Sequence, residues 1–167
     1  MRPLLVDLGR DFRGGQHQAL LLLQGLVARG HSPELITLRD SLLASRARSA
    51  GITVHPVGER WRRVSAALAI RNLLAKHAAD IVHANEPHAL TAAWLASTHR
   101  RVPLIASRRV IFPLKRGTIS LARYRSAARV IAVSQCVATA VSASEFSADR
   151  LIVIPDGVPI PPLRPAT

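Results

Sequence analysis

Short apolar runs recur along this chain, and longer stretches with helical periodicity separate them. Leu4–Leu8 and Glu34–Leu38 are two such runs, and between them the apolar residues from Ala19 to Val27 repeat at the spacing of one helix face, with Gly30 as the stop. Runs without apolar–polar alternation are typical of parallel strands that are covered on both faces. The sequence therefore predicts an α/β fold: a Rossmann-like, doubly wound, mainly parallel sheet with helices on both faces.

The rest of the chain continues this alternation. Further strands are predicted over Ile52–Pro56, Ile81–Ala84, Pro103–Ser107, Val130–Val133 and Leu151–Ile154. Further helices are predicted over Leu42–Ala50, Trp61–His77, from Pro87 onward, over Leu114–Ala128, and after Ser134 as an N-cap. Residues 1–154 are predicted to form one domain, and the proline-rich residues 155–167 the start of an interdomain linker.

The net charge of +13 is unevenly distributed along the chain. Between Pro87 and Ser144 there is no Asp or Glu, yet that stretch holds Arg100, Arg101, Arg108, Arg109, Lys115, Arg116, Arg123, Arg125 and Arg129. Such a field attracts phosphate on nucleic acid, on anionic lipid or on a nucleotide-linked sugar; the alternative is a solvated basic surface. Nucleic acid is disfavoured, because stacking aromatics are not interleaved with the cations and no helix-turn-helix or zinc signature appears.

The segment from Ile111 to Arg129 combines apolar residues with five of those cations, namely Lys115, Arg116, Arg123, Arg125 and Arg129. Leu114, Leu121 and Ala128 would share one face of its predicted helix. This composition fits an interfacial helix on an anionic membrane, and it fits equally a sheet-covering helix whose apolar face is buried. No run is long enough to span a membrane and no signal peptide is apparent, so we expect a cytoplasmic location, at most peripheral on the inner face of the cytoplasmic membrane.

Ligands of open α/β sheets bind beyond the carboxyl ends of the strands, so polar residues at those positions are candidates. After the first strand, Gly14 and Gly15 precede a helix, with Asp11 and Gln16 close by. Glycines and a helix N-terminus let backbone N–H groups approach an anion, although a simple tight turn would look the same.

The fourth and fifth predicted strands also end in polar residues. His83, Asn85 and Glu86 lie at the end of the fourth, where a core histidine is the alternative reading. Arg108 and Arg109 follow the fifth and suit a phosphate or carboxylate, unless they are only surface charge.

Several kinds of site are not supported by the sequence. Cys136 is the only cysteine, and no HExxH or Asp-x-Asp pattern occurs, so neither zinc nor carboxylate-held magnesium is expected. A serine hydrolase is disfavoured because no Gly-x-Ser-x-Gly elbow is present.

Five segments, in order, resemble motifs of family 4 glycosyltransferases. They are Gly14-Gly15 with Leu26–His31 (GG…GLxxRGH), Asp80–Asn85 (D-I-V-H-x-H), Pro103–Val110 (a turn after strand five), Arg129–Ser134 with Val137 (R-V-I-A-V-S…V) and Ile152–Val158 (V-I-P-N-G-V). The family often has histidine where this chain has Asn85, and asparagine where it has Asp156. The first departure puts a histidine acid/base role at that position in doubt.

This resemblance covers about Leu4 to Val158 and implies the acceptor-side, N-terminal half of a GT-B enzyme, without the donor-binding C-terminal domain. Gly14, Gly15 and Gln16 would then face the donor diphosphate. His83, Asn85 and Glu86 would lie near the reacting sugar, and Asp11, Arg108 and Arg109 would serve the acceptor. No cofactor is implied, because protein cations and helix dipoles stabilise the leaving diphosphate in this fold class.

The implied function is acceptor binding in a retaining transfer from a nucleotide-sugar to a lipid-linked or cell-envelope glycan. The expected partners are the second domain, the nucleotide-sugar, the glycan or lipid acceptor and an anionic membrane surface. The chain is expected to be inactive alone. The alternative is a stand-alone basic module that binds anionic lipid or nucleic acid without catalysis.

Overall fold

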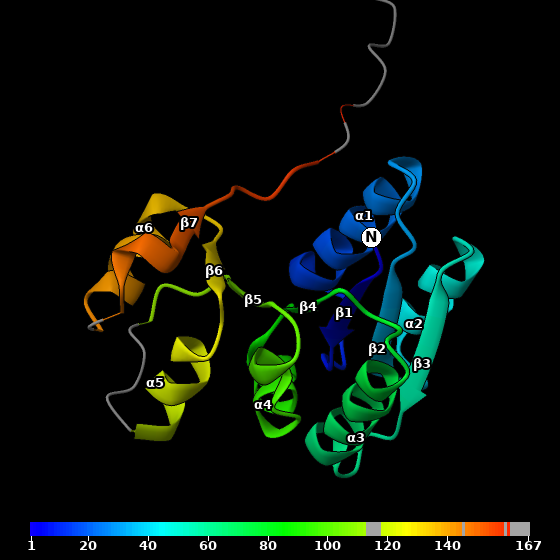
Figure 1. Ribbon diagram of the computed structural model, residues 1–167. Helices are drawn as coiled ribbons and strands as arrows, with labels where there is room; N and C mark the ends of the chain where they lie inside the picture. The colour runs from blue at the N-terminus through cyan, green and yellow to red at the C-terminus, as the bar shows by residue number, and fades with distance from the viewer. Residues whose placement is uncertain (113–117, 145, 159, 161–167) are drawn as a thin grey trace, which may run out of the picture.

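A single parallel sheet of seven strands organises the protein in the computed structural model, which describes residues 1–112, 118–144, 146–158 and 160 (Figure 1). The strands run in the order β3-β2-β1-β4-β5-β6-β7. They span Pro3–Asp7 (β1), Glu34–Leu38 (β2), Thr53–Val57 (β3), Ile81–Ala84 (β4), Leu104–Arg108 (β5), Arg129–Ala132 (β6) and Leu151–Val153 (β7). The predicted Rossmann-like α/β fold is confirmed, and every strand pair is parallel.

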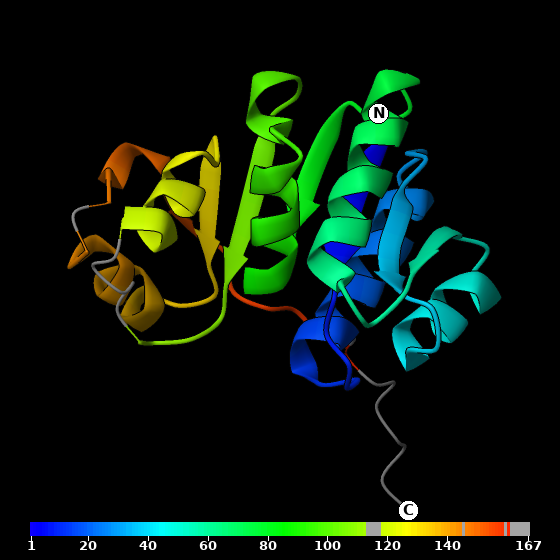
Figure 2. The same cartoon turned by 90° about the horizontal axis from the view of Figure 1, so that it is seen from below.

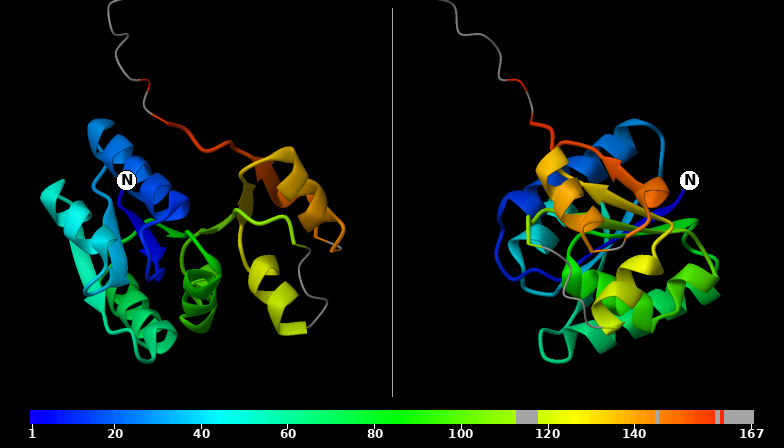
Figure 3. Two further views of the ribbon diagram at one scale, coloured as in Figure 1. Left: turned by 180° about the vertical axis from the view of Figure 1, so that it is seen from behind. Right: turned by 90° about the vertical axis from the view of Figure 1, so that its left-hand side faces the viewer.

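Helices cover both faces of this sheet (Figures 2 and 3). They are α1 (Gly14–Ala28), α2 (Leu42–Ser49), α3 (Arg62–Ala75), α4 (Pro87–Leu95), α5 (Thr118–Arg125) and α6 (Gln135–Ser142), with short 3-10 turns at Thr98–Arg100 and Ala148–Arg150. Helices α1 and α2 pack on one face and α3, α4 and α5 on the other, while α6 lies beside β6 and β7. The sheet is therefore the middle of three layers.

Successive side chains of β1 show why its run of apolar residues is needed. Leu4 and Val6 point into the cluster under α3 and α4, whereas Leu5 points into the cluster under α1 and α2. Because strand side chains alternate between faces, a strand with helices on both sides must be apolar at consecutive positions.

The helix ends follow local signals that the sequence carries. Ser134 accepts a hydrogen bond from the Val137 amide at 3.3 Å, which confirms it as the N-cap of α6. Pro87 is the first residue of α4, as predicted. Gly30 and Gly51 follow α1 and α2 with a φ of +75°, a conformation that costs other residues a clash with their own Cβ.

The predicted helix over Leu114–Ala128 is only partly observed. Residues 113–117 lie outside the described part, and α5 ends at Arg125, three residues before the predicted end. The Ala128 amide donates to the Leu104 carbonyl at 2.7 Å, so the chain has already left the helix and is joining β5. Arg129 is consequently the first residue of β6 and not part of a helix.

Candidate functional site

The strand order places a crevice between the carboxyl ends of β1 and β4. Strand β1 has β2 on one side and β4 on the other, so the chain runs in opposite directions from this point. In open α/β sheets such a switch point is where ligands bind. The predicted candidates after the first, fourth and fifth strands all lie along this edge of the sheet.

A buried carboxylate anchors the crevice. Asp7 ends β1, has no exposed surface, and accepts hydrogen bonds from the Asn85 side-chain amide at 2.6 Å and from the Gly9 amide at 2.9 Å. The Gln16 amide nitrogen reaches both Asp7 oxygens at 3.1 Å, and its oxygen accepts from the Arg13 amide at 3.2 Å. Asp7 thus fixes the start of α1 against the end of β4.

Arg109 joins this cluster from the end of β5. Its Nη1 donates to both the backbone and the side-chain oxygen of Asn85 at 2.9 Å, and its Nε to Asp156 at 3.4 Å. A Cβ placed on Gly15 would lie 3.6 Å from the Arg109 Cδ, an ordinary van der Waals contact, so the stem of Arg109 passes directly over the start of α1. One arginine therefore contacts α1, β4 and the segment after β7.

Several predicted residues line one hollow of about 150 Å³ at this edge. They are Gly15, Gln16, Asn85, Glu86, Arg108 and Arg109. The lining of the hollow is mostly apolar, and the hollow lies at the N-terminus of α1, where unpaired N–H groups and the helix dipole favour an anion. The predicted role of these residues in binding a phosphate stays a prediction.

Glu86 is occupied in capping α4. Its oxygens accept from the amides of His88 and Ala89 at 2.6 Å each, and from the Leu8 amide at 3.3 Å. Burial raises the pKa of the Glu86 carboxyl, while these hydrogen bonds oppose that shift. The carboxylate is positioned by backbone amides and links α4 to β1, so its predicted catalytic role stays a prediction.

His83 lies beside the cluster, on the other side of Arg109. Its Nε2 is 2.7 Å from the Ser107 hydroxyl, and both side chains line a hollow of about 710 Å³ between α1 and the segment Ile154–Val158. Burial, and then the positive charge of Arg109, lower the pKa of His83 to about 4. The imidazole is therefore neutral at pH 7.

The lowered pKa of His83 makes the free energy of unfolding depend on pH. An unfolded histidine binds a proton below about pH 6.5, whereas folded His83 does so only near pH 4, so stability falls as the pH drops through that window. Between about pH 7.5 and pH 5 we expect a loss of about 2 kcal/mol in the free energy of unfolding. Urea unfolding of wild type and His83→Gln measures it, with the exposed His99→Gln as control. An identical pH profile in His83→Gln would contradict the assignment.

Two predicted residues do not join the cluster. Arg108 borders the hollow, but its guanidinium lies on the opposite face of β5, where it is buried and donates to the Tyr124 hydroxyl at 3.1 Å and to the Phe112 carbonyl. Asp11 is exposed and pairs only with Arg13, at 2.6 Å, among the contacts that the structure describes. Gly14 has open space around it, with no atom within 4 Å of an added Cβ.

The cations predicted for a membrane patch are spread over different elements. Lys115 and Arg116 lie outside the described residues. Arg123 is half-buried and donates to Thr91 on α4, Arg125 is exposed on α5, and Arg129 is exposed on β6. Leu121 is partly buried against the core, as in a sheet-covering helix, whereas Ile111, Phe112 and Ile119 are 58%, 69% and 63% exposed, so the membrane reading of this segment stays a prediction.

A second group of residues lies at the same edge and is not among the predicted site residues. The Arg62 Nη2 lies 3.0 Å from the His88 Nε2, and Arg10 pairs with Glu59. Burial, then Arg62, Arg63 and Arg123, lower the pKa of His88. Arg10 and Arg62 each follow a strand closely in the sequence, and that position was the only signal that could have found them.

The described residues contain no cluster of three or more His, Cys, Asp and Glu side chains that could hold a metal ion. Among the described helices, none is long and apolar enough to cross a membrane. The expectation of a metal-free, cofactor-free site stays a prediction.

Comparisons with known proteins agree with this architecture. The model of the family described as Glycosyltransferase Family 4 matches residues 12–160. No curated protein sequence matches the chain.

Several solved structures share the fold at low sequence identity. HepE of Anabaena, in complex with UDP-glucose, aligns with a TM-score of 0.77 at 20% identity over 95% of this chain and 44% of its own. A glycosyltransferase of Rickettsia africae aligns at 0.74 and 19% identity, over 94% and 43%. The lipopolysaccharide outer core galactosyltransferase WaaB aligns at 0.66 and 15% identity, over 98% and 48%.

The chain spans less than half the length of these structures, and at such identities the likeness shows the fold alone. It corresponds to one Rossmann-like half of the GT-B fold. The family model covers most of the chain, including the predicted glycine pair and the turn after β7. On these grounds the chain belongs to glycosyltransferase family 4, as an N-terminal domain.

Proposed function

We propose that this chain is the acceptor-binding half of an enzyme that transfers a sugar from a nucleotide-sugar to a lipid-linked or cell-envelope glycan, at the inner face of the cytoplasmic membrane. The observation that carries the proposal is the position of Arg109 at the switch point, beside the N-terminus of α1. A guanidinium and a helix N-terminus converging on one small hollow suit a phosphate group. The family membership and the UDP-glucose seen in HepE support a nucleotide-sugar as its source.

In this proposal the residues divide the work between charge and position. Arg109 and the first turn of α1 stabilise the negative charge that grows on the leaving diphosphate. Asp7 and Asn85 fix the position of Arg109 relative to α1, because Asn85 accepts from Arg109 and donates to Asp7, and Asp7 accepts from Gln16 on α1. The neutral His83 supplies a hydrogen-bonding group beside the site and carries no charge there at pH 7.

The donor is expected to bind weakly to this chain alone. The nucleotide and most of the sugar would be held by a second domain, and the structures that resemble this chain are more than twice as long. We expect UDP-glucose to bind with a Kd on the order of 1 mM. NMR titration of the ¹⁵N-labelled chain tests this, with amide shifts expected at Gly14, Gly15, Asn85 and Arg109. Micromolar binding, or shifts confined to another edge of the sheet, would contradict the proposal.

Two adjacent glycines offer a matched control for that titration. Gly15→Val places side-chain atoms against the Arg109 stem, whereas Gly14→Val meets no atom within 4 Å of its Cβ. Gly15→Val should abolish the amide shift that UDP-glucose causes at Arg109. Gly14→Val should retain the contact between Arg109 and Asn85. Equal effects of both substitutions on that contact would show that the passage of the Arg109 stem over Gly15 does not position the guanidinium.

A further inference from the structure

A group of cations lies around the start of α4, at the edge of the sheet that carries the candidate site. Arg62 is the first residue of α3, and its Nη2 lies 3.0 Å from the Nε2 of His88 in the first turn of α4. The Arg62 Nη1 donates to the Leu8 carbonyl at 3.4 Å, directly after β1. Two uncharged acceptors from different parts of the chain therefore hold this guanidinium in place.

The histidine beside Arg62 is suited to accept its hydrogen bond. Burial lowers the pKa of His88, and the positive charges of Arg62, Arg63 and Arg123 lower it further, so the imidazole is neutral at pH 7. A neutral imidazole has one acceptor nitrogen, whereas a protonated one has none. The three arginines lie close enough to act on one imidazole, so their positive fields add at this point.

Among the residues that the structure describes, no carboxylate forms an ion pair with Arg62 or Arg63. Glu59, two residues before α3, is paired with Arg10. Glu86, at the start of α4, accepts from three backbone amides. Arg62 is half-buried, and a partly desolvated cation without a counter-ion is unfavourable. A bound anion would offset that cost.

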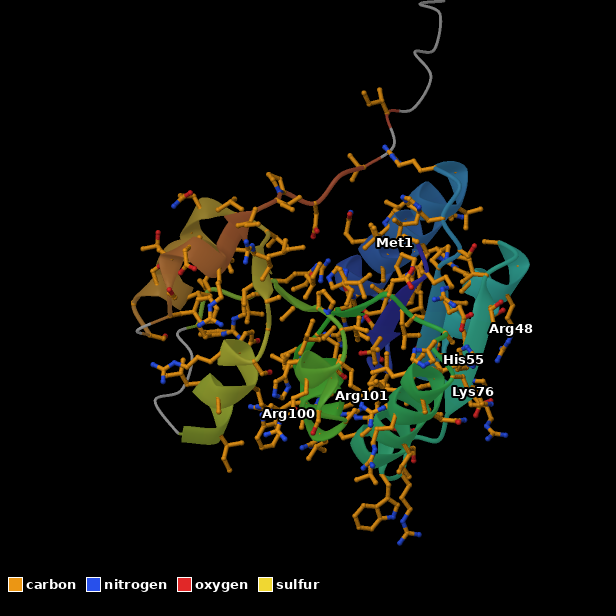
Figure 4. All side chains as sticks on the ribbon, in the orientation of Figure 1. Met1, Arg48, His55, Lys76, Arg100 and Arg101 are labelled. Carbon is orange, nitrogen blue, oxygen red and sulfur yellow. The ribbon has the colours of Figure 1, made fainter. Side chains whose placement is uncertain are left out.

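Cations at the other ends of the same helices have a different setting. Lys76 follows α3, and Arg100 and Arg101 come after α4 (Figure 4). All three are exposed, as is usual for surface charge. Arg62 differs from them because it is half-buried and is oriented by two protein acceptors.

A hollow of about 520 Å³ opens beside Arg62, between α3 and α4. Three arginines, Arg10, Arg62 and Arg63, line it together with Trp61 and Leu95. Trp61 is 72% exposed and has a φ of +63°, in the left-handed region, where glycine or asparagine would fit with less strain. Strain of this kind persists where a position has a function beyond folding. The hollow thus combines cations with an exposed aromatic ring.

We infer that this hollow binds the acceptor through a phosphate or carboxylate group on the acceptor sugar. The Arg62 site is defined here by Arg10, Trp61, Arg62 and Arg63. A planar guanidinium matches either oxyanion with paired hydrogen bonds. The indole ring offers an apolar face to the C–H groups of a sugar ring, and small-molecule sites ordinarily combine apolar walls with a few polar anchors. A neutral glycan would leave the arginines without a partner.

This inference deepens the proposed function, on which it rests for the existence of an acceptor. There Arg109 is assigned to the donor diphosphate, so an anion at Arg62 belongs to the second substrate. A short chain of contacts connects the two arginines. Glu86 lines the hollow at Arg109 and accepts from the Leu8 amide, and the Leu8 carbonyl accepts from Arg62. An acceptor anchored at Arg62 by its charged group would therefore lie beside the crevice.

NMR titration at constant ionic strength tests the Arg62 site and needs no enzymatic activity. With the ¹⁵N-labelled chain we expect glucose 6-phosphate and glucuronate to shift the Arg62 Nε–H and the Trp61 indole N–H, and glucose to shift neither. Inorganic phosphate should shift the Arg62 resonance alone, because it has no ring to contact the tryptophan. The sugar ligand that binds more tightly identifies the charged group. In Arg109→Met these shifts should persist, because separate arginines bind the two anions.

Matched variants separate the two parts of the site. Arg62→Met should weaken the binding of glucose 6-phosphate about tenfold, in line with the loss of hydrogen bonds to a charged group. Arg71→Met, at an exposed position of the same helix, should leave that binding unchanged. Trp61→Asn suits the left-handed conformation, so the fold should be retained. It should weaken the binding of glucose 6-phosphate about fivefold and leave that of inorganic phosphate unchanged.

Several results would overturn the inference. They are equal shifts with glucose and glucose 6-phosphate, equal effects of Arg62→Met and Arg71→Met, and loss of the Arg62 shift in Arg109→Met. The amide shifts caused by UDP-glucose report the candidate site separately. If the anionic sugars leave Arg62 unchanged while UDP-glucose shifts Gly15, the Arg62 site is rejected and the proposed function stands. The reverse pattern would reject the proposed function and leave Arg62 as an anion site of another kind.

Discussion

Asp7→Ala is expected to destabilise the protein by about 4 kcal/mol, within the range for breaking a buried, fully hydrogen-bonded polar group. The Asp7 carboxylate has no exposed surface and accepts from Gly9, Gln16 and Asn85. Its removal leaves these donors without their acceptor at a position that has no exposed surface in the folded protein. The start of α1 and the end of β4 lose their connection at the same time.

Urea unfolding measures this effect as a lower midpoint at an unchanged slope. Asp11→Ala is the control, because Asp11 lies in the following loop, is exposed and pairs only with Arg13 among its described contacts; a change within about 0.5 kcal/mol is expected. An alanine variant as stable as wild type would show that the cost of burying the carboxylate outweighs its hydrogen bonds.

The fold followed from the sequence because its signals are local. Leu4–Leu8, Glu34–Leu38 and Ile81–Ala84 agree with β1, β2 and β4 to within one residue at each end, since buried strands need consecutive apolar residues. The error at Leu114–Ala128 has a different cause. There the helix ends where the Ala128 amide bonds to Leu104, a contact between segments 24 residues apart that helical periodicity does not encode.

The site could be located from the sequence but not assembled. Arg108 and Arg109 are adjacent in the sequence. Only the path of the chain at the end of β5 decides that Arg109 faces the crevice and that Arg108 contacts Tyr124 on the other face of the sheet. The pair of Arg62 and His88 depends on how α3 packs against α4, to which neither residue gives a local signal.

The buried side of α3 follows from the sequence. Helical spacing of Ala66, Ile70, Leu73 and Leu74 indicates one apolar face, and Ala66, Ile70 and Leu74 are buried in the core with Leu73 packed against it. The exposure of Val64 and Leu68 on the same helix does not follow from that spacing, because it depends on what packs against α3.

Arg109→Met should have the largest effect on catalysis. In an enzyme that joins this chain to a donor-binding domain, we expect the rate of sugar transfer to fall by about 10² to 10³, the usual cost of removing one group that stabilises developing negative charge. Methionine keeps much of the stem that passes Gly15 but donates no hydrogen bond. Asn85 and Asp156 then lose the guanidinium that joins them.

Two further variants separate charge from geometry at this position. Arg109→Lys keeps the charge but cannot reach both Asn85 oxygens and Asp156 in a planar fork, so it should recover only part of the lost rate. Arg48→Met, on the exposed end of α2, should leave transfer unchanged. Steady-state kinetics with donor and acceptor varied in turn measure each effect. Removal of a group that acts only on developing charge lowers kcat. If Arg109→Met instead alters the KM of the acceptor alone and leaves kcat unchanged, the guanidinium binds the acceptor and does not stabilise the leaving diphosphate.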